Sequence, residues 1–509
     1  MPARIWIGAV GHRDVVDTPE LRARIRETVR EIVDIASRQC SAPVSLGVVT
    51  SAAEGADRVI ADVVLAEADD AVLQLICPLP ADDYSQDFGT SASLHAFERI
   101  RQRALLVNEG SPTANRDDAY VWASEQVVRQ SDVLIAVWDG EPARGRGGTA
   151  DAVGLARSSE PSVPLFHIGS KEPQLHAAPE AIRFHHLDGV ERFNAGFAHR
   201  HLLEDDQGRV RSVPANDKTT VWFGTYLERS DIEALRCQRA YTLGTLVLFW
   251  GAFAAATVAA VHGTILEDVT SLLWAEAMIL ALLLGVLTTV RALRWHQRWL
   301  DYRALAEWCR CAVYRHATAP GPAEVALIGG SMQRNRHWLT RVREEVWFGC
   351  PIVEDPPDFG ALHGRVSSWV TGQIDYHRRL GLSCLKRKRT LDLAVYLSFV
   401  VTLAAVLLHA VGVHHDGLLL TSTSLTFASV VLPSAAGAAA GVRANRDYQR
   451  NADRSRHAAA DLTRLVINIE QATELNQLNR AVSTVSDRLM RENGDWFDVM
   501  IYHDPELHV

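Results

Sequence analysis

The sequence lacks the signatures of several common protein classes. It contains no GxxxxGKS/T loop and no GxGxxG after a candidate strand, which excludes a Walker-type phosphate site and a standard dinucleotide fingerprint. It also contains no G-x-S-x-G nucleophile elbow and no His, Asp and Glu group at metal-ligand spacing. Its seven cysteines are scattered and odd in number, which is typical of a reducing compartment rather than a disulfide framework. The net charge of −9 argues against a general nucleic-acid-binding protein.

Charge is almost absent from four long apolar runs, and this absence predicts a membrane protein. The runs cover residues 241–261, 271–290, 391–413 and 418–442. Only Glu276 and Asp392 interrupt them with charge, and Asp392 lies at an end. Each run has about 20 residues or more, which at 1.5 Å per residue is enough to cross a hydrocarbon core ~30 Å thick. We therefore expect an all-α membrane domain with four transmembrane helices.

The distribution of Lys and Arg predicts the orientation of these helices. Basic residues follow the second and fourth runs and precede the third, whereas the short loops at 262–270 and 414–416 contain neither Lys nor Arg. Because basic loops stay in the cytoplasm, we expect both termini and the central linker on the cytoplasmic side. Residues 1–10 lack the charged start and apolar stretch of a signal peptide and are typical of a first β-strand, so we expect the membrane domain to insert internally.

Short β-type runs alternate with helical patterns from residue 4 to about residue 170. The candidate strands are residues 5–9, 44–49, 71–77, 133–138 and 164–168. The candidate helices between them are residues 19–38, 54–68, 94–106, 119–130 and 149–157. Such alternation predicts a Rossmann-like α/β domain, in which helices cover both faces of a parallel sheet. Ligands of these folds bind beyond the carboxyl ends of the strands.

Residues suited to binding an anion follow these strand ends. The candidate ligand-binding residues are Gly11, His12, Arg13, Ser51, Glu54, Gly55, Asp57, Asp139, Gly140, Gly147, Gly148 and Thr149. Arg13 supplies a cation, while the hydroxyl of Ser51 and the free amides of the helix that follows it suit an anionic group. Gly147 and Gly148 allow close backbone approach, and we expect Thr149 to cap the next helix. Each turn taken singly is equally well explained as an ordinary turn, and the pattern assigns no catalytic residue and no metal ligand.

The combination of these turns resembles the SLOG superfamily. The resemblance rests on residues 9–13 (AVGHR), 51–57 (SAAEGAD) and 137–140 (VWDG) leading to 147–149 (GGT), and it covers about residues 1–170. This superfamily includes the cytokinin-activating phosphoribohydrolases and the N-terminal ligand-binding region of melastatin-type TRP channels. The resemblance implies a domain that binds nucleotides or nucleotide-derived signals, including ADP-ribose derivatives in bacterial defence systems. Residues 147–151 lack the PGGxGTxxE spacing of the phosphoribohydrolases, so we expect binding without rapid turnover.

The membrane half of the sequence contains an internal repeat. Residues 297–301 (QRWLD) after the second apolar run correspond, at an offset of 152, to residues 449–453 (QRNAD) after the fourth. Each half reads as a basic helix, two spans and a long polar helix, which we expect at residues 293–317 and 443–491. Each half resembles the SLATT domain, a two-span effector that accompanies SLOG domains in bacterial conflict systems. This resemblance implies a pore-forming or membrane-disrupting unit in the inner membrane.

These patterns predict five segments. A SLOG-like sensor covers residues 1–170, an extension covers 171–228, a first two-span unit covers 229–350, a linker covers 351–377, and a second two-span unit covers 378–509. The extension contains Pro, His and charged residues with short β-like stretches such as residues 219–223. A chain of 509 residues has room for this organisation.

Six residues of the apolar runs are candidates for a pore wall or for helix packing. They are Glu276, Ser422, Thr426, Ser429, Gly437 and Gly441. The three hydroxyls recur at helical spacing and suit a wet face, or they bond to carbonyl oxygens of their own helix. A carboxylate inside a span is costly, so Glu276 either faces protein or water or extends to the interface. The two glycines form a GxxxG pattern that lets helices approach closely.

Together these features predict a membrane effector in which an ADP-ribose-type or cyclic nucleotide binds the sensor and triggers a four-span pore. We expect a homo-oligomer, most simply a tetramer by analogy with the channels whose sensor it resembles, with no nucleic-acid partner and no cofactor beyond the nucleotide-derived ligand. One alternative is a membrane-anchored nucleotide hydrolase or phosphoribohydrolase, with Glu54, Asp57, Asp139 or Asp151 as acid or base. Another is a transporter or scaffold with a regulatory sensor. Four spans exceed what an enzyme anchor needs, which favours the effector.

Overall fold

The computed structural model describes residues 1–112, 115–142, 145–179, 181–198, 218–319, 337–351, 358–412 and 421–500. The chain divides into two compact units and passes from one to the other three times. The sheet unit comprises Met1–Gln207 and Gly321–Gly349, and the helical unit comprises Gly208–Pro320 and Cys350–Val509. The predicted fold class is confirmed, because an N-terminal α/β sheet is followed by a helical region with four long apolar helices.

The sheet unit contains a seven-stranded sheet in the order β4-β3-β2-β1-β5-β6-β7. Its strands are β1 (Ala3–Gly11), β2 (Val44–Thr50), β3 (Val72–Cys77), β4 (Leu106–Glu109), β5 (Val133–Trp138), β6 (Leu165–Gly169) and β7 (Leu175–Ala177). Neighbouring strands pair in parallel, except that β7 is antiparallel to β6. The five predicted strands are confirmed to within two residues at each end, whereas the short strands β4 and β7 were not predicted.

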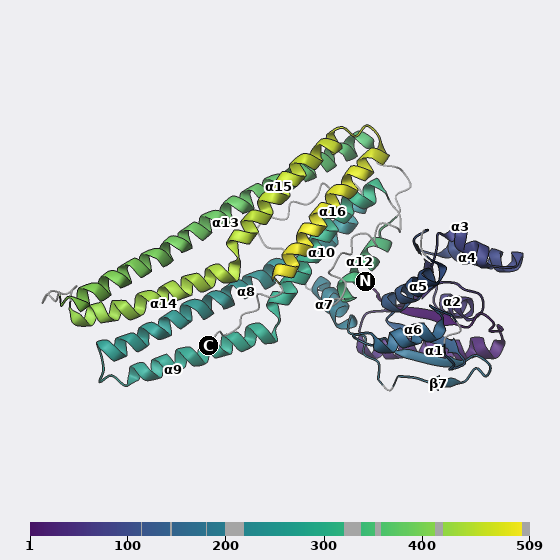
Figure 1. The fold of residues 1–509 in the computed structure, drawn as a ribbon, viewed down its shortest axis with the longest axis horizontal. Coiled ribbons are helices and arrows are strands. Elements are labelled where there is room, and N and C mark those ends of the chain that lie inside the picture. Colours follow the sequence, from purple (N-terminus) through teal and green to yellow (C-terminus); the bar gives the residue numbers. More distant parts are fainter. Residues whose placement is uncertain are drawn as a thin grey trace. The chain divides into compact units, whose positions relative to one another are not determined.

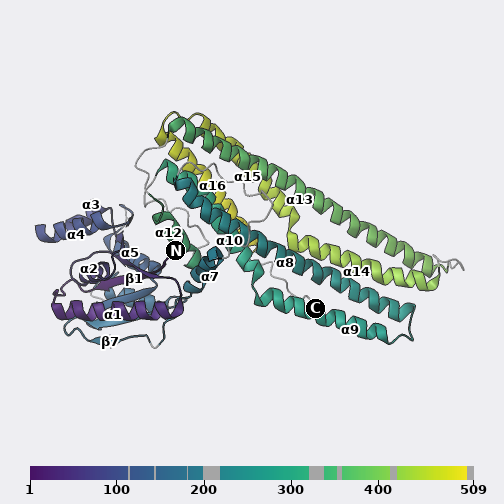
Figure 2. The same ribbon diagram turned by 180° about the vertical axis from the view of Figure 1, so that it is seen from behind.

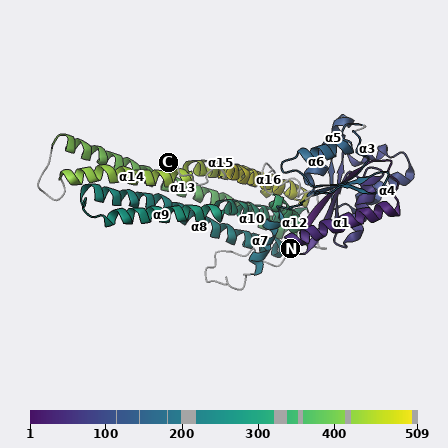
Figure 3. The same ribbon diagram turned by 90° about the horizontal axis from the view of Figure 1, so that it is seen from below.

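Helices cover both faces of this sheet. They are α1 (Pro19–Gln39), α2 (Ala56–Glu67), α3 (Ala81–Tyr84), α4 (Ser91–Arg103), α5 (Arg116–Gln130), α6 (Thr149–Ser158), α7 (Leu187–Ala198) and α12 (His337–Phe348). Figure 3 shows α1 on one side of the sheet and α5 and α6 on the other. Helix α1 begins where the hydroxyl of Thr18 accepts from the N–H of Leu21. Strand β1 is buried on both faces, as expected for a central parallel strand.

The strand order places a topological switch point between β1 and β5. From β1 the chain winds outward to β4, and it then returns to β5 and continues to β6 on the other side of β1 (Figure 1). The loops that follow Gly11 and Trp138, at the carboxyl ends of these two strands, therefore run in opposite directions. Ligands of open α/β sheets bind in the crevice that such diverging loops leave.

Helix α12 belongs to the sheet unit although it lies between the two repeats in the sequence. Residues 337–348 were predicted to belong to the first two-span unit, but they cluster with the sheet, where α12 contacts α7 and β1. The extension at 171–228 also divides between the two units. It supplies β7 and α7 to the sheet unit and the beginning of α8 to the helical unit, and its residues 199–217 lie outside the described part of the chain.

Long helices make up the helical unit (Figure 2). They are α8 (Lys218–Thr264), α9 (Ser271–Ala292), α10 (Trp295–Thr318), α13 (Phe359–Ala410), α14 (Ser422–Arg446), α15 (Tyr448–Glu470) and α16 (Leu475–Met500). Four stretches, carried by α8, α9, α13 and α14, are long and apolar enough to cross a membrane. Only 6–28% of each stretch is buried within the chain, so these helices expose large apolar surfaces. The predicted loop at 414–416 lies outside the described residues.

The two halves of the helical unit repeat one arrangement. In the first half α8 packs with α9 and then with α10, and in the second half α13 packs with α14 and then with α15 (Figure 2). In both halves a left-handed residue that is not glycine separates the second helix from the third. These residues are Arg294 (φ 49°) and Asp447 (φ 41°). They lie 153 positions apart, within one residue of the sequence offset of 152, so the backbone geometry agrees with the predicted repeat.

Three predictions of local structure were wrong or incomplete. Residues 219–223 are not β-like, because Thr219, Thr220 and Phe223 are the buried positions of a helical turn in α8. Residues 359–377, assigned to a linker, are part of α13 and are continuous with the third apolar run. The single polar helix expected at 443–491 is divided among α14, α15 and α16, and its breaks contain neither Gly nor Pro.

Candidate ligand-binding site at the β1–β5 switch point

The ends of β1 and β5 are joined through His12 and Asp139. Nε2 of His12 lies 2.9 Å from Oδ1 of Asp139. The backbone N–H of His12 donates to the carbonyl oxygen of Val137 at 3.1 Å. Oδ1 of Asp139 also accepts from the backbone N–H of Glu141 at 3.0 Å, which closes a turn at Gly140, whose φ is +84°. The first and fourth predicted turns are therefore in direct contact.

The turn after β1 packs closely on the turn before α2. The backbone N–H of Ala56 donates to the carbonyl oxygen of His12 at 3.1 Å. Gly55 has φ +80°, and a Cβ there would lie 2.5 Å from the carbonyl oxygens of both His12 and Arg13. A Cβ on Gly11 would lie 2.3 Å from that of Ala56. Both glycines are thus required by the close approach of the two backbones.

Asp57 is buried beneath these two turns and is only 6% exposed. Its Oδ2 lies 3.4 Å from the hydroxyl of Thr50, which donates to it. Burial raises the pKa of Asp57 to about 7, although backbone hydrogen bonds from Ala53 and Gly11 and the charge of Arg13 act in the opposite direction. Asp57 therefore holds the turns together from inside the protein, and its carboxyl group does not face solvent.

An aromatic ring lies beside the exposed residue Arg13. Its guanidinium carbon lies 5.5 Å from the centroid of the Tyr120 ring, and the Tyr120 hydroxyl donates to Asp87. The fully buried Tyr84 donates to the carbonyl oxygen of Ser51 at 3.1 Å. A cation beside an aromatic ring suits a ligand that has both an anionic and a planar part. Tyr120 was not predicted as a site residue, because it lies within α5 and no local motif marks it.

The remaining candidates of the α2 turn lie beside a second arginine. Ser51 and Glu54 are half-buried, and Glu54 stabilises the charge of Arg58. Arg58 was not predicted as a site residue. Its Nε donates to the carbonyl oxygen of Ala52 at 2.9 Å, and its guanidinium carbon lies 4.6 Å from the centroid of the Phe88 ring. Arg58 therefore shapes the turn that carries Ser51 and Glu54.

The glycine turn before α6 packs against α5. Gly147 has φ +74°, and a Cβ there would lie 2.5 Å from the carbonyl carbon of Tyr120. The N–H of Gly147 donates to Oδ2 of Asp151 at 2.7 Å. The prediction that Thr149 caps α6 was wrong, because the extended Gly148 occupies the cap position and Thr149 is the first helical residue. Within the described chain no side chain caps this helix, which leaves its amino end available to an anion.

These contacts bring the predicted turns into one neighbourhood. His12 contacts Asp139 and the α2 turn, while Tyr120 contacts both Arg13 and Gly147. Among the described residues there is no group of three or more His, Cys, Asp or Glu that could hold a metal ion. Cation, aromatic ring and helix amino end together suit a nucleotide-like anion.

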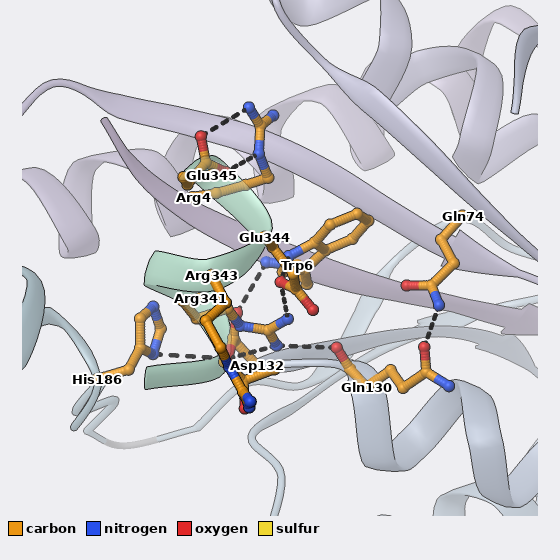
Figure 4. A network of polar contacts seen from close by, with 11 residues as sticks. Arg4, Trp6, Gln74, Gln130, Asp132, His186, Arg341, Arg343, Glu344 and Glu345 are labelled. Atoms are coloured by element: carbon orange, nitrogen blue, oxygen red, sulfur yellow. Dashed lines mark hydrogen bonds and ion pairs between the residues drawn. The ribbon is translucent and has the colours of Figure 1, made fainter. Parts of the chain in front are cut away.

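A second polar network lies at the opposite, amino ends of the same two strands and joins them to α12 (Figure 4). Nη2 of Arg341 lies 3.0 Å from Oδ1 of Asp132, the residue before β5, and donates to the carbonyl oxygen of Gln130 at 2.9 Å. Nδ1 of His186 lies 3.5 Å from the same carboxylate. Burial opposes ionisation of Asp132, but the charges of Arg341 and His186 hold its pKa below the usual value.

Two further contacts connect β1 with α12. Arg4 forms an ion pair with Glu345, and both side chains are 9% exposed. The indole N–H of Trp6 donates to Oε2 of Glu344 at 3.1 Å. The amino ends of β1 and β5 are thus anchored on a helix whose flanking segments lead into the helical unit.

Two of the three hydroxyl candidates, Thr426 and Ser429, bond within their own helix. The hydroxyl of Thr426 donates to the carbonyl oxygen of Ser422 at 2.9 Å, and that of Ser429 donates to the carbonyl oxygen of Thr426 at 2.7 Å. Glu276 is half-buried, and it forms no hydrogen bond or ion pair with any described residue. A carboxylate at this depth requires water or a polar partner.

The glycine candidates differ from one another. A Cβ on Gly441 would lie 2.5 Å from the ring of Phe249, so this glycine allows α14 to approach α8. Gly251 similarly lies against Leu283 of α9, with 2.4 Å from its Cβ position to the leucine methyl carbon. A Cβ on Gly437 would meet nothing within 4 Å among the described residues. Gly437 therefore lies on an exposed face of the chain.

Comparison of the chain with protein-family models finds no match, and comparison with curated proteins also finds none.

Proposed function

We propose that the protein is a ligand-gated membrane effector. In this proposal the sheet unit is a SLOG-like sensor that binds a nucleotide-derived anion of the ADP-ribose or cyclic-nucleotide type at the β1–β5 switch point. The helical unit is a pair of SLATT-like hairpins that opens a pore or perturbs the bilayer in response. The bacterial defence role implied by the two resemblances is part of the same proposal.

The observation that carries this proposal is the position of α12. The candidate ligand site lies at the carboxyl ends of β1 and β5, and α12 is anchored at their amino ends. The nine residues of β1 span roughly 30 Å at about 3.3 Å per residue. A shift of β1 caused by a ligand at His12 would therefore act on Arg4 and Trp6, and through them on α12. Contiguous packed elements of this kind carry coupling between sites.

The surroundings of the carboxylates favour binding over hydrolysis. Asp57 is buried under the turns, Asp139 is engaged with His12 and a backbone N–H, and Asp151 accepts from the N–H of Gly147. These three side chains are thus engaged in holding the loops. A hydrolase could use four carboxylates as acid or base. Since three of them hold the loops, Glu54 is the one that remains for proton transfer.

The membrane arrangement is part of the proposal. We place the protein in the inner membrane with both termini in the cytoplasm, in accordance with the distribution of Lys and Arg. A homo-oligomer, most simply a tetramer, would cover part of the exposed apolar surface of the four helices and leave the rest to lipid. It would also give Glu276 a polar neighbour or a water-filled path.

Liposome flux measurements test the proposal. Purified protein is reconstituted with an entrapped ion-sensitive dye and exposed to a panel of ADP-ribose-type and cyclic nucleotides, and each ligand is assayed for breakdown in parallel. We expect at least one ligand to evoke flux, with no more than one product molecule per protein. Rapid breakdown that depends on Glu54, without flux, would instead support the hydrolase.

A further inference from the structure

Four basic residues on α13 form no ion pair with any residue that the structure describes. They are the exposed residues Arg379, Lys386, Arg387 and Arg389. Other basic residues at the same level are paired. Lys388 lies 2.7 Å from Asp392, and Arg443 of α14 lies 2.5 Å from the other oxygen of the same carboxylate. The four residues therefore leave uncompensated positive charge on one short stretch of helix.

This stretch lies at the border of the third apolar run. Lys386, Arg387 and Arg389 precede the start of the run at residue 391 by two to five residues, which is within about 8 Å along the helix axis. The headgroup layer on each side of a bilayer is roughly 5–8 Å thick. Arg379 lies about 10 Å further along the axis from Lys386. Three of the four charges thus fall within the thickness of one headgroup layer.

The basic residues continue a face that is exposed along the span. Lys386 and Arg389 share this face with Leu393 and Tyr396 at spacings of three and four residues. Leu393 is 57% exposed and Tyr396 is 66% exposed. Since an exposed apolar face of a span contacts lipid chains, the same face carries the two cations to the headgroups of those lipids.

The first repeat carries less unpaired basic charge at the corresponding border. Arg236 and Arg239 precede its apolar run by five and two residues, but Arg236 pairs with Glu233, and only the exposed Arg239 forms no ion pair with a described residue. At the offset of 152, the counterparts of the four basic residues are Leu227, Ala234, Leu235 and Cys237. The concentration of unpaired basic residues at this border is therefore a feature of the second repeat. The positive-inside rule counts all Lys and Arg near a span, whether paired or not. The paired residues already satisfy it, so the orientation of the helices does not explain why these residues are unpaired.

We propose that Lys386, Arg387 and Arg389 form a binding surface for the headgroups of anionic phospholipids such as phosphatidylglycerol. The lipid phosphates supply the negative charge that these side chains lack within the protein. The exposed face of the span contacts the acyl chains of the same lipids. The proposal rests on the membrane insertion assumed in the proposed function. It does not depend on a ligand for the sheet unit.

The test uses the full-length protein in detergent, with phosphatidylglycerol and phosphatidylcholine titrated separately and bound lipid counted by native mass spectrometry. We expect the wild-type protein to bind phosphatidylglycerol more tightly. Each basic residue near an anionic surface strengthens the attraction about fivefold, so K386Q/R387Q/R389Q should weaken phosphatidylglycerol binding by roughly 100-fold. The conservative triple variant K386R/R387K/R389K should retain it.

The matched control is R450Q/R456Q/R464Q, which removes three exposed arginines of α15, each paired with an Asp side chain three residues earlier in the sequence. It changes the net charge equally and should leave phosphatidylglycerol binding within about threefold of wild type. Equal binding of both lipids by the wild-type protein, or equal loss in both glutamine triples, overturns the inference. Flotation of each variant with liposomes is measured separately, so that failure to insert contradicts the proposed function and not the lipid site alone.

Discussion

Replacement of Arg341 by Ala is the most informative perturbation of the α12 network. Its guanidinium is 5% exposed, and it contacts Asp132 at 3.0 Å, Glu344 at 3.0 Å and the carbonyl oxygen of Gln130 at 2.9 Å. The substitution leaves the buried Asp132 without its guanidinium partner. Removing one member of a buried pair costs about 3–5 kcal/mol, which corresponds to a roughly 10²- to 10⁴-fold larger opening equilibrium.

Hydrogen exchange measured by mass spectrometry on the full-length protein shows which segments lose stability. We expect faster exchange in peptides from β1, β5 and α12 of the R341A protein, with the helical unit unchanged. Arg183 provides the control, because it pairs with Asp188 at the surface, at 70% and 52% exposure, and R183A should cost less than about 1 kcal/mol.

Replacing both charges of the buried pair with apolar groups, in D132L/R341M, should restore much of the protection. The reasoning is refuted if R341A exchanges no faster than R183A, or if only α12 is affected. In liposomes R341A should retain ligand binding and lose ligand-evoked flux.

Three further predictions concern single positions. G55A should destabilise the sheet unit in urea by clearly more than G140A, because both glycines have positive φ but only Gly55 has backbone atoms 2.5 Å from a Cβ position; equal costs would mean that close approach is unimportant. Burial raises the pKa of Asp57 to about 7 from about 4 in an unfolded chain, so its contribution to stability is present below about pH 4 and is lost as the pH rises through about 7. In D57N the urea midpoint should therefore vary less with pH between pH 5 and pH 8 than in the wild type. An unchanged pH dependence would contradict the raised pKa of Asp57. G441L should disrupt packing within one chain and lower its melting temperature, whereas G437L, whose Cβ meets nothing within 4 Å among the described residues, should leave the monomer intact and weaken only assembly on a size-exclusion column.

Most strands of the sheet unit and the four apolar helices were predictable because their signals are local. An apolar run such as residues 391–413, or the β-type run at residues 5–9, needs no knowledge of distant partners. Strand β4 was missed because it has four residues and begins three residues after α4 ends. The break between α15 and α16 was missed because no Gly or Pro marks it.

The place of α12 and the role of Tyr120 could not be predicted because both depend on tertiary contacts. The partners of Arg341 and Glu344 lie 209 and 338 positions away in the sequence, so no local pattern marks these two residues. Tyr120 meets the glycine turn only when α5 packs beside α6. Asp57 was correctly placed at the strand ends, but its burial beneath the turns depends on how closely Gly11 approaches Ala56.

Ligand-evoked ion flux compared between wild type and G148W tests the central claim most directly. Gly148 is half-buried at the open amino end of α6, and its φ of −76° is accessible to any residue. A Cβ there would lie 3.1 Å from the carbonyl oxygen of Gly145, which requires a small adjustment of that turn, and a tryptophan ring would occupy the expected position of the anion. Wild-type liposomes should show flux on addition of at least one ADP-ribose-type or cyclic nucleotide, and G148W liposomes should show none, with equal amounts of folded protein inserted. Flux that is identical in the two proteins, or rapid ligand breakdown without flux in the wild type, would contradict ligand gating through this site.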